Sequence, residues 1–88
     1  MEFKYLKQEN NEAEILLDNL TIAEILREYL NQDSKVEFAA WRREHPMKKE
    51  VILRIETKGK TPKKALQDSV TRIEKELDSL VRELKKAK

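Results

Sequence analysis

The sequence predicts an α+β fold with the element order β-β-α-β-β-α. Four short stretches alternate apolar and polar residues, as half-buried strands do, while two others place apolar residues at helical spacing. Short polar segments connect the stretches, which favours antiparallel neighbours. We therefore expect a four-stranded antiparallel sheet with two helices on one face, the long C-terminal helix lying in a dimer interface.

Length and composition limit the class of protein. The 88 residues suffice for a single domain, 1–88, and 41% of them are charged while 39% are hydrophobic. Cysteine is absent, which excludes disulfides and cysteine-ligated zinc or iron–sulfur sites. No apolar run approaches the ~18 residues of a membrane span, and the first residues do not resemble a secretory signal, so we expect a cytoplasmic protein. A net charge of only +2 gives weak support for non-specific nucleic-acid binding.

The first two strands are predicted to form a hairpin. Alternation over Met1–Lys7 predicts the first strand, and Leu6 breaks the pattern. The polar segment Gln8–Asn11 suits a turn. Alternation then resumes at Ala13–Leu17, which predicts the second strand.

The first helix is predicted from about Ile22 to Asn31. Its apolar residues recur at helical spacing, with charged residues on the opposite side. Thr21 and Glu24 have the spacing of a capping box, in which each side chain accepts a hydrogen bond from a free backbone N–H at the helix start. We therefore place the helix start next to Thr21.

The third and fourth strands are predicted on either side of a His45-Pro46 break. Alternation from Val36 to about Arg43 would place Val36, Phe38 and Ala40 on one face of the third strand. Proline cannot donate to a strand ladder, so Pro46 ends this element. A fourth strand follows over Val51–Lys58. Gly59, the only glycine, is expected to turn the chain with a positive φ.

The last segment predicts one long helix. Thr61 suits an N-cap, Pro62 suits the first helical position, and no glycine or further proline follows up to Lys88. Such a helix of about 26 residues would be ~39 Å long, whereas the strands would be roughly 20–25 Å long. Its apolar residues are separated by 4, 3, 4, 3 and 4 positions, which is a heptad seam: Leu66, Val70, Ile73, Leu77, Leu80 and Leu84. Either the seam packs on its own sheet and its end frays, or it packs on a second chain, which is the reading that we favour.

The sequence contains few residues in arrangements typical of a catalytic or metal-binding site. His45 is the only histidine and has no neighbouring ligand or catalytic partner in the sequence, so a turn role is favoured. Residues 57–61 (Thr-Lys-Gly-Lys-Thr) superficially resemble a phosphate-binding loop but lack its glycine spacing. We expect no catalytic residue, no metal site and no cofactor in this chain.

One basic and aromatic cluster is a candidate contact for nucleic acid or another protein. Trp41, Arg42 and Arg43 are followed by Lys48 and Lys49, and an aromatic ring beside arginines can stack on bases and bind phosphate. Several glutamates lie close by in the sequence, and strand edges often carry basic residues to prevent aggregation. Direct nucleic-acid contact is therefore the minority reading.

An ordered set of motifs resembles the family of archaeal RNA polymerase subunit L. The resemblance covers Thr21–Leu30, Val36–Trp41, His45-Pro46, Thr57–Gly59 and Thr61–Leu66, in the family's order and spacing. The chain departs from the family before the first helix, where an acidic residue and a histidine are usual. That family is similar to the eukaryotic eleventh subunit and to the dimerisation part of the bacterial alpha subunit.

The resemblance implies a non-catalytic assembly subunit of an archaeal DNA-dependent RNA polymerase. That polymerase is the nucleotidyltransferase of transcription, a transferase, and its catalytic residues would lie in other chains. The resemblance also implies a heterodimer with the alpha-like subunit, designated D, and this pair together with subunits N and P is the platform for the large catalytic subunits. The implied partner interface uses both helices: Ile22, Ile25, Leu26, Tyr29, Leu66, Val70, Ile73, Leu77, Leu80 and Leu84.

Two other functions stay open from the sequence. A small self-dimerising RNA-binding module, such as a Pcc1-like subunit of a tRNA-modification complex, would have a similar order of strands and helices. A free-standing small-molecule enzyme is the least supported reading, because no reactive group of residues is present.

Overall fold

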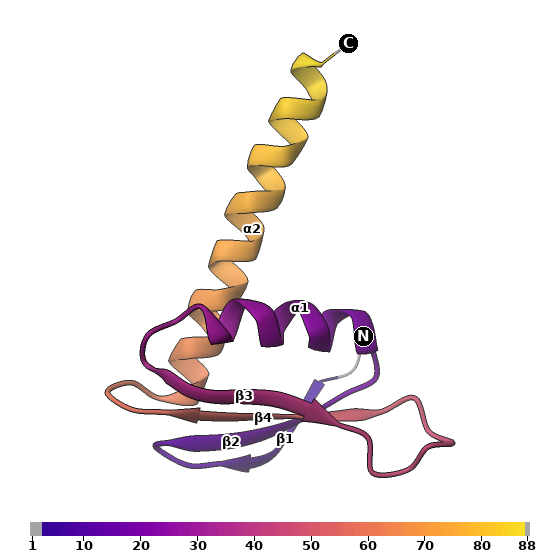
Figure 1. Ribbon diagram of the computed structural model, residues 1–88, viewed down its shortest axis with the longest axis vertical. Coiled ribbons are helices and arrows are strands. Elements are labelled where there is room, and N and C mark those ends of the chain that lie inside the picture. Colours follow the sequence, from indigo (N-terminus) through magenta and orange to yellow (C-terminus); the bar gives the residue numbers. More distant parts are fainter. Residues whose placement is uncertain (1–2, 88) are drawn as a thin grey trace.

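The structure is a computed structural model that describes residues 3–87. Its elements follow the predicted β-β-α-β-β-α order (Figure 1): β1 Phe3–Gln8, β2 Glu12–Leu17, α1 Leu20–Asn31, β3 Val36–Arg42, β4 Val51–Thr57 and α2 Pro62–Lys86. The two ends of the chain assigned from the sequence to the first strand and the last helix, residues 1–2 and 88, lie outside the described residues.

The four strands form one antiparallel sheet in the order β1-β2-β4-β3, and both helices lie on the same side of it (Figure 1). The central strands β2 and β4 supply the largest share of the core, and their inward side chains lie opposite one another across the ladder. Ile15 is opposite Leu53, and Leu17 is opposite Val51. These four side chains are fully buried, and Leu30 of α1 packs onto the same cluster. The predicted fold class is confirmed.

Two bulges set which residues of the edge strands face the core. The register of β1 shifts between Tyr5 and Lys7, where the sequence alternation breaks. The register of β3 shifts between Val36 and Phe38, so the predicted single face through Val36, Phe38 and Ala40 is wrong. The shift turns Ala39 and Trp41 toward the core and leaves Phe38 exposed, since an extra residue in one strand inverts the faces after it.

Helix α1 starts earlier than predicted and has a different cap. The side chain of Asn19 accepts a hydrogen bond from the backbone N–H of Ile22 at 3.1 Å, and the helix begins at Leu20. The Thr21–Glu24 capping box is therefore wrong. Asparagine is at least as good an N-cap as threonine, and Asn19 leaves Glu24 free to bind Arg27 instead.

Helix α2 begins as predicted and continues far beyond the sheet. Gly59 has a φ of 89°, which confirms the expected positive value in the turn that precedes the helix. The side chain of Thr61 accepts from the N–H of Lys64 at 3.2 Å, and Pro62 occupies the first helical position. The helix has 25 residues, about 38 Å at 1.5 Å per residue, and its C-terminal half projects away from the rest of the molecule (Figure 1).

Candidate partner-binding surface

A groove of about 900 Å³ opens on the helix side of the molecule, where β1, α1 and α2 meet. Most of its lining is apolar, and each of the three elements contributes: Phe3 and Tyr5 from β1, Ile22 and Ile25 from α1, and Val70, Ile73 and Leu77 from α2. Lys63, Lys64 and Asp68 stand among the polar residues of its lining. We call this feature the apolar groove.

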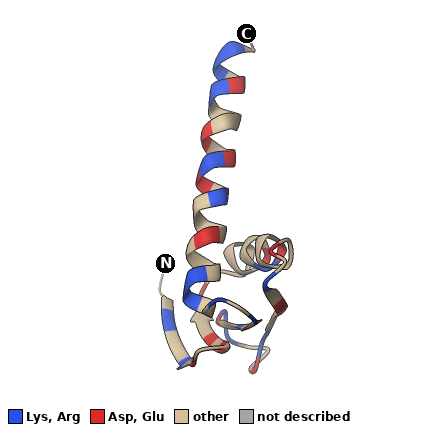
Figure 2. Ribbon diagram, turned by 90° about the vertical axis from the view of Figure 1, so that its left-hand side faces the viewer, with Lys and Arg blue, Asp and Glu red and all other residues tan. Residues whose placement is uncertain are grey.

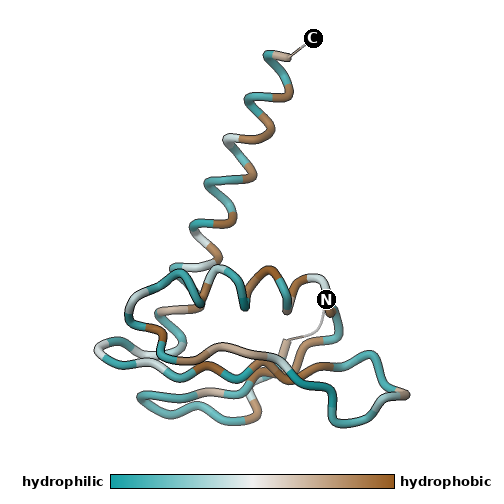
Figure 3. Tube along the Cα trace, in the orientation of Figure 1, coloured by the Kyte–Doolittle hydropathy of each residue, from teal (hydrophilic) through white to brown (hydrophobic). Residues whose placement is uncertain are grey.

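The heptad seam carries the apolar surface of the groove onward along the projecting part of α2. Leu77 is 56% exposed and Leu84 is 64% exposed, and Leu80 and Val81 are similarly open. Figure 3 shows hydrophobic residues recurring along the whole projecting helix. Full burial of a leucine is worth about 1.5–3 kcal/mol, so covering the exposed half or more of each of these leucines is worth roughly half that amount. We call Leu77, Leu80, Val81 and Leu84 the distal seam.

The predicted interface residues occupy three levels of burial. Leu26 and Leu66 are only 5% and 7% exposed and belong to the chain's own core, where they form the floor of the apolar groove. Ile22 and Ile73 are partly buried against that core. Val70 and the three leucines of the distal seam are exposed. The structure thus brings the two helices together as one apolar surface, and the role of these residues in a partner interface stays a prediction.

Polar contacts that the sequence analysis missed hold α2 against α1. The hydroxyl of Tyr29 donates to Glu76, and Arg72 lies over the Tyr29 ring with its guanidinium carbon 5.5 Å from the ring centre. Arg72 also donates to the Gln32 side chain at 2.6 Å. The hydrogen bond to Glu76 raises the pKa of Tyr29, because the phenol must stay protonated to donate. Tyr29, predicted as an apolar interface residue, therefore also fixes the direction of α2.

A second set of contacts anchors the start of α2. The ammonium of Lys60 pairs with Asp33 and, at 2.8 Å, with Asp68. Hydrogen bonds from Lys60 lower the pKa of both carboxyls, while the pKa of Lys60 is raised, first by Asp33. In addition, Thr57 donates its hydroxyl to the Lys60 carbonyl. The Lys60 ammonium in the turn at Gly59 is thus paired with two carboxylates of the same chain, as expected of a structural turn.

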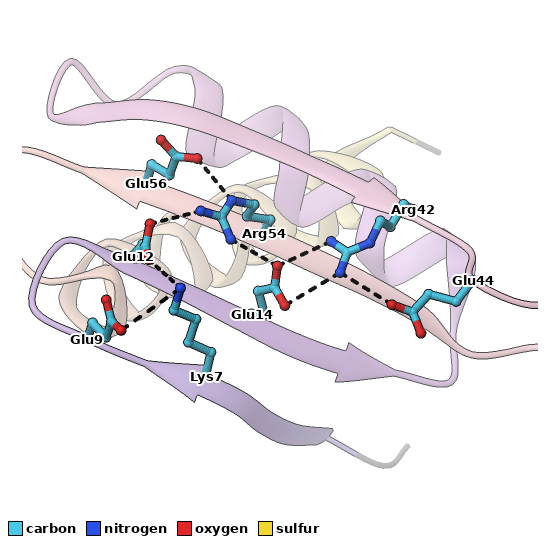
Figure 4. A network of polar contacts seen from close by, with 8 residues as sticks. All are labelled: Lys7, Glu9, Glu12, Glu14, Arg42, Glu44, Arg54 and Glu56. Carbon is cyan, nitrogen blue, oxygen red and sulfur yellow. Dashed lines mark hydrogen bonds and ion pairs between the residues drawn. The ribbon is translucent and has the colours of Figure 1, made fainter.

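The face of the sheet opposite the helices carries a network of paired charges (Figure 4), beside the apolar side chains of Leu16, Ile52 and Phe38. Arg54 donates to Glu12 at 2.8 Å, to Glu14 at 2.9 Å and to Glu56 at 2.9 Å. Arg42 also pairs with Glu14, at 3.3 Å. Hydrogen bonds from Arg42 and then Arg54 hold the pKa of Glu14 below its usual range, and that of Glu12 is lowered chiefly by Lys7. We call this set of eight residues the outer-face network: Lys7, Glu9, Glu12, Glu14, Arg42, Glu44, Arg54 and Glu56.

The candidate nucleic-acid cluster is split by the alternation of β3. Trp41 packs against the core on the helix side and donates its indole N–H to Glu24. Arg42 belongs to the outer-face network, and Arg43 is exposed beyond the end of the strand. Since neighbouring strand residues point to opposite faces, Trp41 and Arg42 do not form one stacking platform. His45 is exposed, and its carbonyl accepts from the N–H of Lys48 at 3.0 Å in a turn.

Nothing in the described part of the chain has the form of a metal or membrane site. Residues 3–87 contain no group of three or more histidine or carboxylate side chains that could hold a metal ion. Among the same residues, neither helix is long and apolar enough to cross a membrane.

Comparisons with known proteins agree with this arrangement. The family model described as the RNA polymerase Rpb3/Rpb11 dimerisation domain matches residues 11–83, which include α1 and most of α2. The chain belongs to this family. It is 32% identical over 88 residues to DNA-directed RNA polymerase subunit Rpo11 of Sulfurisphaera tokodaii, covering 97% of this chain and 95% of that protein. It is 37% identical over 78 residues to the Rpo11 subunit of Thermococcus sibiricus, covering 83% and 82%.

A solved structure shares the fold of this chain. The crystal structure of DNA-directed RNA polymerase subunit L from Thermoplasma acidophilum matches with a TM-score of 0.85 at 20% identity, covering 97% of this chain and 86% of that one. The family match and the Rpo11 relatives confirm the resemblance to the subunit L family and the expectation of an RNA polymerase subunit of transcription. The alternative of a Pcc1-like RNA-binding module receives no support from these matches.

Proposed function

We propose that this chain is a non-catalytic assembly subunit of a cytoplasmic DNA-dependent RNA polymerase. In this role it pairs with the alpha-like subunit of that enzyme, and the pair forms the platform on which subunits N and P and a large catalytic subunit assemble. The nucleotidyl transfer itself takes place in other chains. One observation carries the proposal: the apolar surface of α2 continues past the edge of the domain and stays uncovered.

The dimension of that surface supports a protein partner over a small ligand. The groove and the distal seam follow one apolar stripe along α2, a helix about 38 Å long. The stripe consists of side chains on one side of each helical turn. Helices bury such stripes by packing against another helix, with side chains of one fitting between those of the other. Membership of the Rpb3/Rpb11 dimerisation family agrees with a partner of this kind.

Co-expression with the alpha-like subunit of the same organism tests the proposal. We expect a stable one-to-one complex on gel filtration, at a mass equal to the sum of the two chains. Persistent failure of the two chains to co-elute, with each one folded, would overturn the proposal. Retention of the isolated chain on immobilised RNA at moderate salt, lost with Arg42→Ala and Arg43→Ala, would favour the RNA-binding alternative instead.

A further inference from the structure

The residues beside the distal seam are acidic, and this arrangement restricts which helix can lie along it. In the heptad, Leu77 and Leu84 occupy position a and Ile73 and Leu80 occupy position d. Positions e and g flank the seam and face the partner's own flanks. Along the projecting part of α2, these positions hold Glu74, Glu76 and Glu83, together with Val81, which belongs to the distal seam itself.

The basic residues of the same stretch lie elsewhere on the helix. Lys75 and Arg82 occupy position f on the side opposite the seam, and Lys85 and Lys86 occupy positions b and c. Arg82 pairs with Asp78 at 3.1 Å, also away from the seam. Acidic and basic residues alternate along the projecting helix in Figure 2, so the one-signed charge belongs to the flanks and not to the helix as a whole.

One flanking carboxylate is held in place by the fold. Glu76 accepts the hydroxyl hydrogen of Tyr29 from α1. Glu74 and Glu83 are exposed. No lysine or arginine of this chain pairs with Glu74, Glu76 or Glu83 among the ion pairs of the described residues. The negative charge beside the seam is therefore available to a partner.

We infer that the acidic flanks of the distal seam select a partner helix with lysine or arginine at its own flanking positions, and reject a second copy of this chain. The inference rests on the proposed function and names the chemistry of the partner at that same surface. In an antiparallel pair of two copies with Leu77 facing Leu80, Glu76 of each copy would face Glu83 of the other. Like charges in such positions disfavour pairing, whereas opposite charges support it.

Reversal of the flanking charge tests the inference. The flank variant carries Glu74→Lys with Glu83→Lys, and the control carries Glu37→Lys with Asp78→Lys, an equal change in net charge on exposed residues away from the seam. At low salt we expect the flank variant to bind the alpha-like partner at least about tenfold more weakly than the wild type, and the control to stay within about twofold. The difference should shrink at ~1 M salt, where screening acts over ~3 Å.

Self-association provides an independent second measurement. The Glu83→Lys substitution places a lysine of one copy opposite Glu76 of the other, so we expect sedimentation equilibrium to show a dimer more readily for the flank variant than for the wild type or the control. Equal binding of the alpha-like partner by all three proteins, equal weakening by the control, or self-association of the wild type as strong as that of the flank variant would overturn the inference. If the wild type itself fails to bind the alpha-like partner, the proposed function fails, and the sedimentation comparison alone decides the inference about charge.

Discussion

The two sides of the sheet differ in whether their side chains already have partners within the chain. On the outer side, every acidic and basic residue of the outer-face network has a partner within this chain, as with Arg54 and its three carboxylates. On the helix side, the apolar groove and the distal seam leave large hydrophobic side chains exposed. A surface whose charges are already paired gains little from a new contact, whereas uncovered apolar area gains from any burial. The contrast predicts that the binding energy for a protein partner comes from the helix side.

The largest effect on partner binding is expected from placing charged residues in the distal seam. With Leu77→Asp and Leu80→Asp, we expect binding of the alpha-like partner to weaken at least ~100-fold, because the burial of two leucines, worth roughly half of 1.5–3 kcal/mol each, is lost and two carboxylates would be buried. Gel filtration of the co-expressed pair measures the loss, and circular dichroism should show an intact fold.

A matched control keeps the charge change on the same helix. Lys75→Gln with Ser79→Asp alters the net charge equally on the side away from the seam and should leave the complex intact. Survival of the complex in the Leu77/Leu80 variant would show that the interface lies elsewhere, and the outer side of the sheet would become the next candidate.

The same substitution in two halves of α2 should separate folding from binding. Leu66 lies in the core, so Leu66→Ala should lower the free energy of unfolding by about 2–4 kcal/mol. Leu84 is exposed, so Leu84→Ala should change the stability of the isolated chain by less than ~0.5 kcal/mol. Urea unfolding of both variants makes the measurement. Comparable destabilisation by the two would mean that the distal seam is already covered in the isolated chain.

A smaller effect is expected where the two helices meet. Tyr29→Phe removes the hydroxyl that donates to Glu76 but keeps the ring beneath Arg72. We expect a loss of stability of about 0.5–1.5 kcal/mol, the usual worth of one hydrogen bond, and a weaker complex with the alpha-like partner because α2 is less firmly oriented. Thermal unfolding and binding titrations measure the two effects, and Thr71→Val, which removes a hydroxyl bonded within α2, is the control for the unfolding measurement. An unchanged affinity would show that this contact does not position α2.

The sequence predicted the features that depend on local periodicity. The strand and helix order follows from alternation and helical spacing, and the heptad seam follows from six apolar positions in one helix. Features made by distant residues were not predictable in this way. The Tyr29–Glu76 contact joins residues 47 positions apart, and the Arg54–Glu12 contact joins residues 42 apart. No local pattern marks such pairs.

The errors of the sequence analysis came from local alternatives of nearly equal energy. Asn19 and Thr21 are both good helix caps, and the structure uses Asn19 while Leu26 and Leu30 of the same helix pack into the core. In β3, strict alternation would have buried Phe38. A bulge puts the small Ala39 beneath α1 instead and leaves room for Trp41 to reach Glu24. In both places, tertiary packing overrode the local pattern.

Because the charges of the outer-face network pair with one another, we expect them to make the free energy of unfolding depend modestly on pH. Because Arg42 and Arg54 depress the pKa of Glu14 in the folded chain, ionised Glu14 stabilises the fold above its unfolded pKa, and this contribution is lost as pH falls through the folded pKa. Glu14→Gln should therefore lower the free energy of unfolding at pH 7 by less than about 1 kcal/mol, since Arg54 keeps two other carboxylates. It should also reduce the loss of stability between neutral and acidic pH. Urea unfolding across pH 3–7 measures this, with the exposed Glu37→Gln on β3 as the control.

Weakened binding of the alpha-like partner by Glu14→Gln at neutral pH would contradict the contrast between the two sides, because it would give the outer face a share of the partner contact.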